Sequence, residues 1–119
     1  MTNRVVIEPL AERDIRVAAL WILSQSRSRK TALGRARRLR AAIATLQDFP
    51  QRCPVDPDSE AYGQKVSVLL HGRPLGIYRV LFAIRGGTVH VLTVRHASRR
   101  GLAEKVADEG REEADEGRS

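Results

Sequence analysis

Two side chains late in the chain, Arg79 and His96, have the types and spacing to act on a phosphodiester. They belong to two runs of β-branched and apolar residues around Gly86-Gly87, a dipeptide typical of tight hairpin turns. If that turn has two residues, Arg79 faces Val94, and His96 lies one step diagonal to it on the same face. A guanidinium can hold a phosphate, and an imidazole can move protons near neutral pH. The sequence therefore predicts a candidate catalytic pair on the open face of a hairpin.

The same turn predicts which face of the hairpin is buried. Counting outward from it gives one apolar face, built from the pairs Ile84–Val89, Phe82–Val91 and Val80–Thr93. The opposite face would carry the pairs Ala83–His90, Leu81–Leu92 and Arg79–Val94. The apolar face of a half-buried antiparallel sheet is the one that packs on the core. We therefore expect the first face to be buried and the second to be open.

Further cations near this pair could hold the phosphates on either side of a reacting one. Cutting RNA through its own 2′-hydroxyl needs a base, an acid and cations around the crowded phosphate. Arg79 could supply charge and His96 proton transfer, while the residues expected to bind RNA are Arg73, Tyr78, Arg95, Arg99 and Arg100. No metal or other cofactor is expected, because Asp, Glu and His show no ligand spacing outside the acidic C-terminal segment. The alternative is an ordinary exposed arginine and a strand-end histidine.

Charge is distributed unevenly along the chain. The net charge is +7, but residues 1–103 carry 18 Lys/Arg against 7 Asp/Glu, whereas residues 104–119 carry 3 against 7. No acid occurs between Asp14 and Asp48, and the basic run there comprises Arg27, Arg29, Lys30, Arg35, Arg37, Arg38 and Arg40. This run is either a helix face that follows phosphates or a solvated face opposite an apolar seam. A basic body of this kind points to nucleic acid, the ribosome or an acidic protein partner.

The elements that must position these residues follow from local patterns. The expected elements are a strand at 4–7, a helix from Pro9 to about Ser26, a second helix after Ser28 that ends before Pro50, a loop at 51–62, a strand at 65–70 and a hairpin at 76–95. Pro favours the first turn of a helix, and Ser favours the N-cap. The order β-α-α-β-β-β predicts an α+β fold in which a helical hairpin covers one face of a mainly antiparallel sheet.

Length and composition predict one domain in a reducing compartment. The 119 residues suffice for a single core, which we place at residues 1–102, with residues 103–119 as a charged, acidic tail that is disordered or a frayed helix. The lone Cys53 excludes an internal disulfide. No run reaches the roughly 18 apolar residues of a membrane span, and the first residues do not resemble a signal peptide. We therefore expect a cytoplasmic protein without membrane contacts.

Several short motifs, in their order and spacing, resemble the RelE/ParE superfamily of bacterial type II toxins. They are PLAERDI at 9–15, LQDFP at 46–50, YRVLF at 78–82 and VLTVRH at 91–96. The resemblance covers roughly residues 4–102. It implies a small α+β domain with a curved sheet and a helical hairpin. It also implies that a cognate antitoxin, expected to have an acidic segment, wraps around the protein and holds it inactive.

The resemblance also implies two modes of action. Ribonuclease members cut mRNA in the ribosomal decoding site, whereas ParE-type members poison DNA gyrase. Arg79 falls on the tyrosine-arginine motif whose arginine is catalytic in ribonuclease members, and His96 falls on a His-x-x-Arg ending that closes here with Arg99. The chain has no aromatic residue after Phe82 to stack a cut base, and Lys65 stands alone where one ribonuclease type has a lysine pair.

The hypothesis from the sequence is thus a type II toxin. As the first possibility it is a metal-independent endoribonuclease that cuts mRNA on the ribosome and is neutralised by its antitoxin. The alternative is a gyrase inhibitor of the same fold that catalyses no reaction, or an inactive relative that binds nucleic acid.

Overall fold

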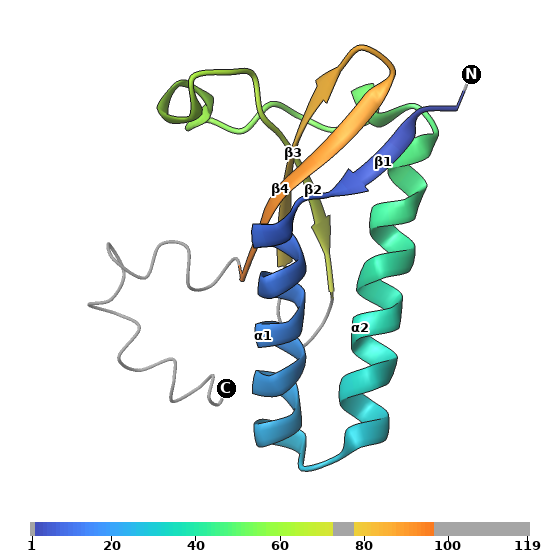
Figure 1. Ribbon diagram of the computed structural model, residues 1–119. Helices are drawn as coiled ribbons and strands as arrows, with labels where there is room; N and C mark the ends of the chain where they lie inside the picture. Colours follow the sequence, from blue (N-terminus) through green and yellow to red (C-terminus); the bar gives the residue numbers. More distant parts are fainter. Residues whose placement is uncertain (1, 73–77, 97–119) are drawn as a thin grey trace.

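Two helices pack against one face of a four-stranded sheet in the computed structural model, which describes residues 2–72 and 78–96 (Figure 1). The elements are β1 (Arg4–Ile7), α1 (Pro9–Ser26), α2 (Arg29–Ala44), β2 (Ser67–His71), β3 (Tyr78–Arg85) and β4 (Thr88–His96). The strand order is β1-β4-β3-β2, and β1 runs parallel to β4 while the other pairs are antiparallel. The predicted α+β class and the order β-α-α-β-β-β are confirmed.

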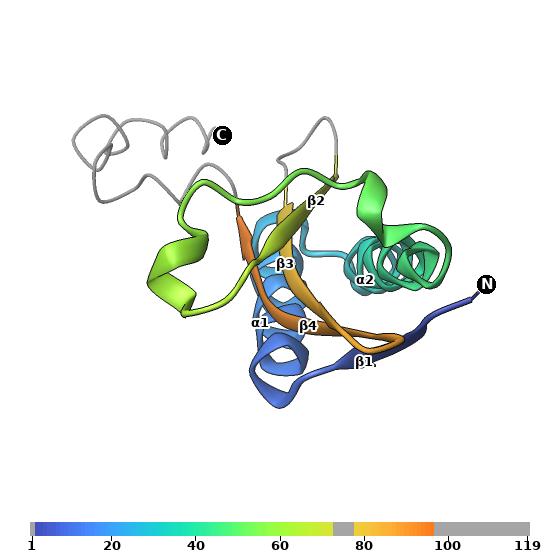
Figure 2. The same ribbon diagram turned by 90° about the horizontal axis from the view of Figure 1, so that it is seen from above.

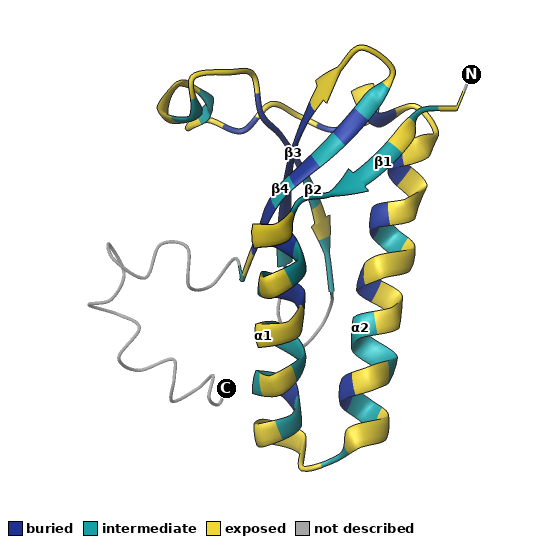
Figure 3. Ribbon diagram, viewed as in Figure 1, coloured by how far each residue is buried: buried dark blue, intermediate teal, exposed yellow. Residues whose placement is uncertain are grey.

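Local signals define the helical hairpin as expected. Pro9 opens α1, and Arg27 ends it in a left-handed conformation, with its N–H donating to the carbonyl of Leu23 at 2.7 Å. The Ser28 hydroxyl then caps α2 by accepting a hydrogen bond from the Thr31 N–H at 3.1 Å. Figure 3 shows the buried positions of the two helices as short patches among residues of intermediate or high exposure. No helix in the described ranges has the length and apolarity to cross a bilayer.

The main core lies between the helices and the sheet. Its fully buried members include Ile15 from α1, Ile43 from α2 and Phe82 from β3. A second cluster lies on the other face of the sheet and comprises Val66, Val68 and Leu81, with Tyr62 and Leu92 packed against them. The segment between α2 and β2 contains the short 3-10 helices Thr45–Gln47, Pro50–Arg52 and Ser59–Tyr62. This segment contributes to the second cluster, so the face that was expected to be open is partly covered.

The diglycine turn has the predicted register only near the turn itself. The pairs Ile84–Val89, Ala83–His90 and Phe82–Val91 are confirmed, with Gly86 at a positive φ of 58°. Beyond them a β-bulge leaves Leu92 without a partner. The observed pairs are then Leu81–Thr93, Val80–Val94, Arg79–Arg95 and Tyr78–His96. The predicted pairs Val80–Thr93, Leu81–Leu92 and Arg79–Val94 are therefore wrong, because the extra residue shifts β4 by one position.

The bulge occurs where β4 changes its neighbour. β1 pairs with β4 only as far as Ile7 and Val91, after which the chain turns into α1. From there the Asp14 carboxylate takes the place of a strand: its Oδ2 accepts hydrogen bonds from the Val94 N–H at 2.9 Å and the Thr93 hydroxyl at 2.6 Å. A side chain from α1 thus satisfies the edge of β4 that β1 leaves uncovered. Figure 2 shows β3 and β4 curving along this part of the sheet.

Replacing Asp14 with alanine is expected to lower the free energy of unfolding by about 2 kcal/mol, because two donors lose their acceptor and Thr93 is only 6% exposed. Urea denaturation of the purified domain measures this loss. Asp14→Asn keeps an oxygen that can accept, so it should lose less than half as much. If the alanine variant matches the wild type within about 0.5 kcal/mol, this carboxylate does not hold the end of β4.

Candidate functional site

Arg79 and His96 lie on opposite faces of the sheet. Tyr78 pairs with His96 and Arg79 pairs with Arg95, and consecutive residues of a strand point to opposite sides. His96 therefore lies on the helix side of the sheet, and Arg79 lies on the other side. The expectation that a guanidinium and an imidazole meet on one open face is wrong, and its cause is the one-residue shift at Leu92.

The Arg79 side chain is held in a buried ion pair. Its guanidinium contacts the carboxylate of Asp56, and the two side chains are 13% and 2% exposed. The Asp56 carboxylate also accepts a hydrogen bond from the backbone N–H of Asp58 at 3.0 Å, and the Asp56 N–H donates to the carbonyl of Val66 at 2.7 Å. Arg79 thus fastens the segment before β2 onto the sheet. The sequence offered no signal for this pair, because 23 positions separate its members.

The His96 ring belongs to an aromatic cluster beside α1. Its centroid is 5.1 Å from that of Tyr78 in an edge-to-face arrangement, and 6.1 Å from that of Trp21. These rings border a hollow of about 240 Å³ between α1 and the end of β4, lined by Asp14, Val17, Ala18, Trp21, Tyr78, Val94, Arg95 and His96. We call this feature the α1–β4 hollow. Its lining combines apolar and aromatic side chains with polar groups, among them one arginine and one carboxylate.

The predicted site residues are therefore divided. Tyr78 and His96 come together at the hollow on the helix side of the sheet, whereas the side chain of Arg79 is largely buried on the opposite face. Arg95 also borders the hollow, although its pairing with Arg79 assigns its side chain to the opposite face. The remaining predicted residues, Arg73, Arg99 and Arg100, lie outside the residues that the structure describes, as does the acidic tail.

An exposed apolar stripe on α1 adjoins the hollow. Leu10, Val17 and Leu20 are 48%, 51% and 64% exposed, and their spacing of seven and three places them on one side of the helix. Val17 belongs to both the stripe and the hollow. Sequence reasoning missed this surface, because it considered only the apolar residues of α1 that recur at helical spacing on the buried side. The number of apolar residues in α1 could have indicated this surface. A helix that buries one stripe leaves its other apolar residues exposed. Contiguous exposed apolar surface marks protein-binding sites.

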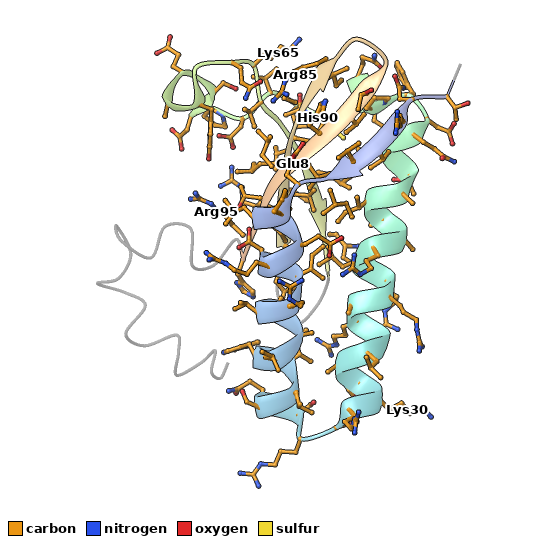
Figure 4. All side chains as sticks on the ribbon, viewed as in Figure 1. Glu8, Lys30, Lys65, Arg85, His90 and Arg95 are labelled. Atoms are coloured by element: carbon orange, nitrogen blue, oxygen red, sulfur yellow. The ribbon has the colours of Figure 1, made fainter. Side chains whose placement is uncertain are left out.

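The contacts and burial of the other titratable groups indicate structural roles. His90 Nδ1 lies 2.8 Å from Glu8 Oε2, and this hydrogen bond ties the start of α1 to β4 (Figure 4). Burial raises the pKa of the Cys53 thiol, which keeps it protonated and poorly nucleophilic. Burial and the nearby charge of Arg38 lower the pKa of His71. Within the described ranges, no three His, Cys, Asp or Glu side chains gather as metal ligands.

Comparisons with known proteins agree with the fold. The comparison with curated proteins found no match. A solved structure described as the chromosomal ParDE TA system from P. aeruginosa resembles this one with a TM-score of 0.66 at 17% identity, over 80% of this chain and 96% of that chain. The family model for the ParE toxin of the type II toxin-antitoxin system, parDE, matches residues 5–101. This match extends over most of the chain, so the protein belongs to the ParE toxin family within the predicted RelE/ParE superfamily.

Proposed function

We propose that this toxin arrests growth by binding DNA gyrase, without cutting RNA. The single observation that carries the proposal is the separation of Arg79 from His96 by the sheet. Cleavage of RNA without a metal needs its base, acid and cation within hydrogen-bond reach of one phosphate. A toxin that acts by occupying a surface of its target has no such requirement. Membership of the ParE family supports the same mode of action.

Neither of the other two histidines replaces the lost pair. His71 pairs with Tyr78 and therefore lies on the helix side of the sheet, away from the Arg79 side chain. His90 lies on the same face as Arg79, but it pairs with Ala83. Ala83 is four residues from Arg79 along β3, which is about 13 Å at the rise of a strand. The Nδ1 of His90 already binds Glu8, and the guanidinium of Arg79 already binds Asp56. These distances and pairings support a role for both residues in the fold.

The family has a cognate antitoxin, and we place its contact with this chain on α1 and the hollow. The stripe of Leu10, Val17 and Leu20 can bury apolar side chains, and Trp21 beside it belongs to the residue types that dominate protein interfaces. Arg13 lies on the same side of α1 as the stripe, and Arg95 borders the hollow. Exposed apolar surface flanked by cations suits an amphipathic segment that carries acids.

Induced expression of the chain in bacteria without its antitoxin tests the target. The expected result is growth arrest with cleaved DNA and an SOS response, while mRNA stays intact, together with inhibition of purified gyrase in a supercoiling assay. Cuts in mRNA that require the ribosome, with intact DNA, would instead establish the ribonuclease. Normal growth at confirmed expression would contradict both modes of action.

A further inference from the structure

Helix α2 carries charges of one sign, and most of them have no counter-charge among the described residues. Its sequence contains six cations and no acid. The exposed ones are Arg29, Lys30, Arg37, Arg38 and Arg40. Arg40 forms an ion pair with Glu12 on α1, at 2.8 Å and 3.2 Å, and the hydrogen bond lowers the pKa of Glu12. In the described ranges the side chains of the other four form no ion pair or hydrogen bond.

These charges act against the stability of their own helix. Arg29 and Lys30 occupy the first turn, where the helix dipole is positive and cations are unfavourable. Arg37 and Arg40, three positions apart, form a like-charged pair. A second such pair is Arg35 and Arg38. Local choices that oppose the fold are expected at functional sites, where a partner compensates them. Such compensation requires an anion from beyond the residues that the structure describes.

Part of this charge forms a row. Arg29, Arg37 and Arg40, with Leu33, are spaced by steps of four and three and therefore share one side of α2. The row is about 16 Å long at the rise of an α-helix. Lys30 continues the charge at the end of the helix farthest from the β3–β4 turn (Figure 4). Arg35 is half-buried and Arg38 lies near His71, so these two do not belong to the row.

The composition of this face favours nucleic acid over protein. Leu33, 51% exposed, is the one large apolar side chain exposed on α2, so the face lacks the apolar centre of a protein interface. Arginine binds phosphate oxygens in a bidentate manner. A straight row of such groups matches the regular backbone of a duplex, which carries one charge per roughly 1.7 Å of axis.

We propose that the row Arg29, Arg37 and Arg40, extended by Lys30, binds the phosphate backbone of double-stranded DNA. The choice of DNA rests on the proposed function, because gyrase holds a DNA duplex against which a bound toxin can lie. The binding itself requires no gyrase, and it is measurable with the purified chain alone.

Fluorescence anisotropy with a labelled 24-base-pair DNA duplex over a series of salt concentrations tests this inference. The test variant combines Arg29→Gln, Lys30→Gln and Arg37→Gln. The control variant combines Arg4→Gln, Lys65→Gln and Arg85→Gln. These substitutions remove three exposed cations near the β3–β4 turn, so the net charge falls by the same amount as in the test variant. Near 0.1 M salt the test variant should bind roughly 100-fold more weakly, and its plot of log K against log salt should flatten by about 2.7, since each phosphate contact contributes about 0.9. The control should retain most of the affinity and the slope.

If the two variants lose DNA affinity equally, the binding depends only on the net charge of the protein, and the inference is overturned. So would equal or tighter binding of the wild type to single-stranded RNA of the same length, or to a polyglutamate peptide. The test variant should unfold at an unchanged or higher temperature, which separates lost binding from lost folding. Gyrase inhibition without DNA binding would overturn this inference alone, and DNA binding without gyrase inhibition would overturn only the proposed function.

Discussion

Asp56→Ala is expected to lower the free energy of unfolding by about 3–5 kcal/mol, because it leaves the Arg79 guanidinium buried without its counter-charge. The two side chains are 2% and 13% exposed, so water cannot replace the lost carboxylate fully. The change also removes the acceptor for the Asp58 N–H. Domains of this size are stable by only about 5–15 kcal/mol. Guanidinium denaturation at neutral pH measures the loss, and a loss below about 1 kcal/mol would contradict a buried pair.

The double variant Asp56→Leu with Arg79→Met separates the structural role of Arg79 from a chemical one. Replacing both members of a buried ion pair by apolar residues often restores stability, so this variant should be more stable than Asp56→Ala. Under the proposed function it also remains toxic, because gyrase binding does not use the guanidinium. A ribonuclease that depends on Arg79 would lose its toxicity in the same stable protein. Growth arrest and denaturation of this one variant therefore test the site and the fold together.

The helices and the first strand could be predicted because their signals are local. Pro9 and Ser28 mark the starts of α1 and α2, and β1 is the short β-branched run before Pro9. The second predicted strand, at 65–70, is observed as Ser67–His71, so its existence is confirmed and its boundaries differ from the prediction by one or two residues. Each of these elements depends on residues within a few positions of one another.

The register of β4 and the covered face could not be predicted from local patterns. The alternation around Leu92 gives no sign of a bulge, which depends on β1 ending at Ile7 and on a carboxylate from α1, 80 positions away from Val94. The cover over the other face depends on Asp56, which the sequence places in a loop rich in proline and acids. Both features come from tertiary contacts, and together they moved His96 and Arg79 apart.

Val17→Glu with Leu20→Glu is expected to weaken antitoxin binding at least about 100-fold, or by roughly 3 kcal/mol, since two apolar contacts become carboxylates that face an acidic partner. Both side chains are more than half exposed, so folding should change little. Val55→Glu with Leu70→Glu is the matched control, because these residues are 49% and 58% exposed near β2. Calorimetry measures the affinities, and growth during co-expression reports neutralisation. If only the first variant arrests growth in the presence of the antitoxin, the antitoxin binds α1. If only the control variant does so, the antitoxin binds at the β2 edge instead.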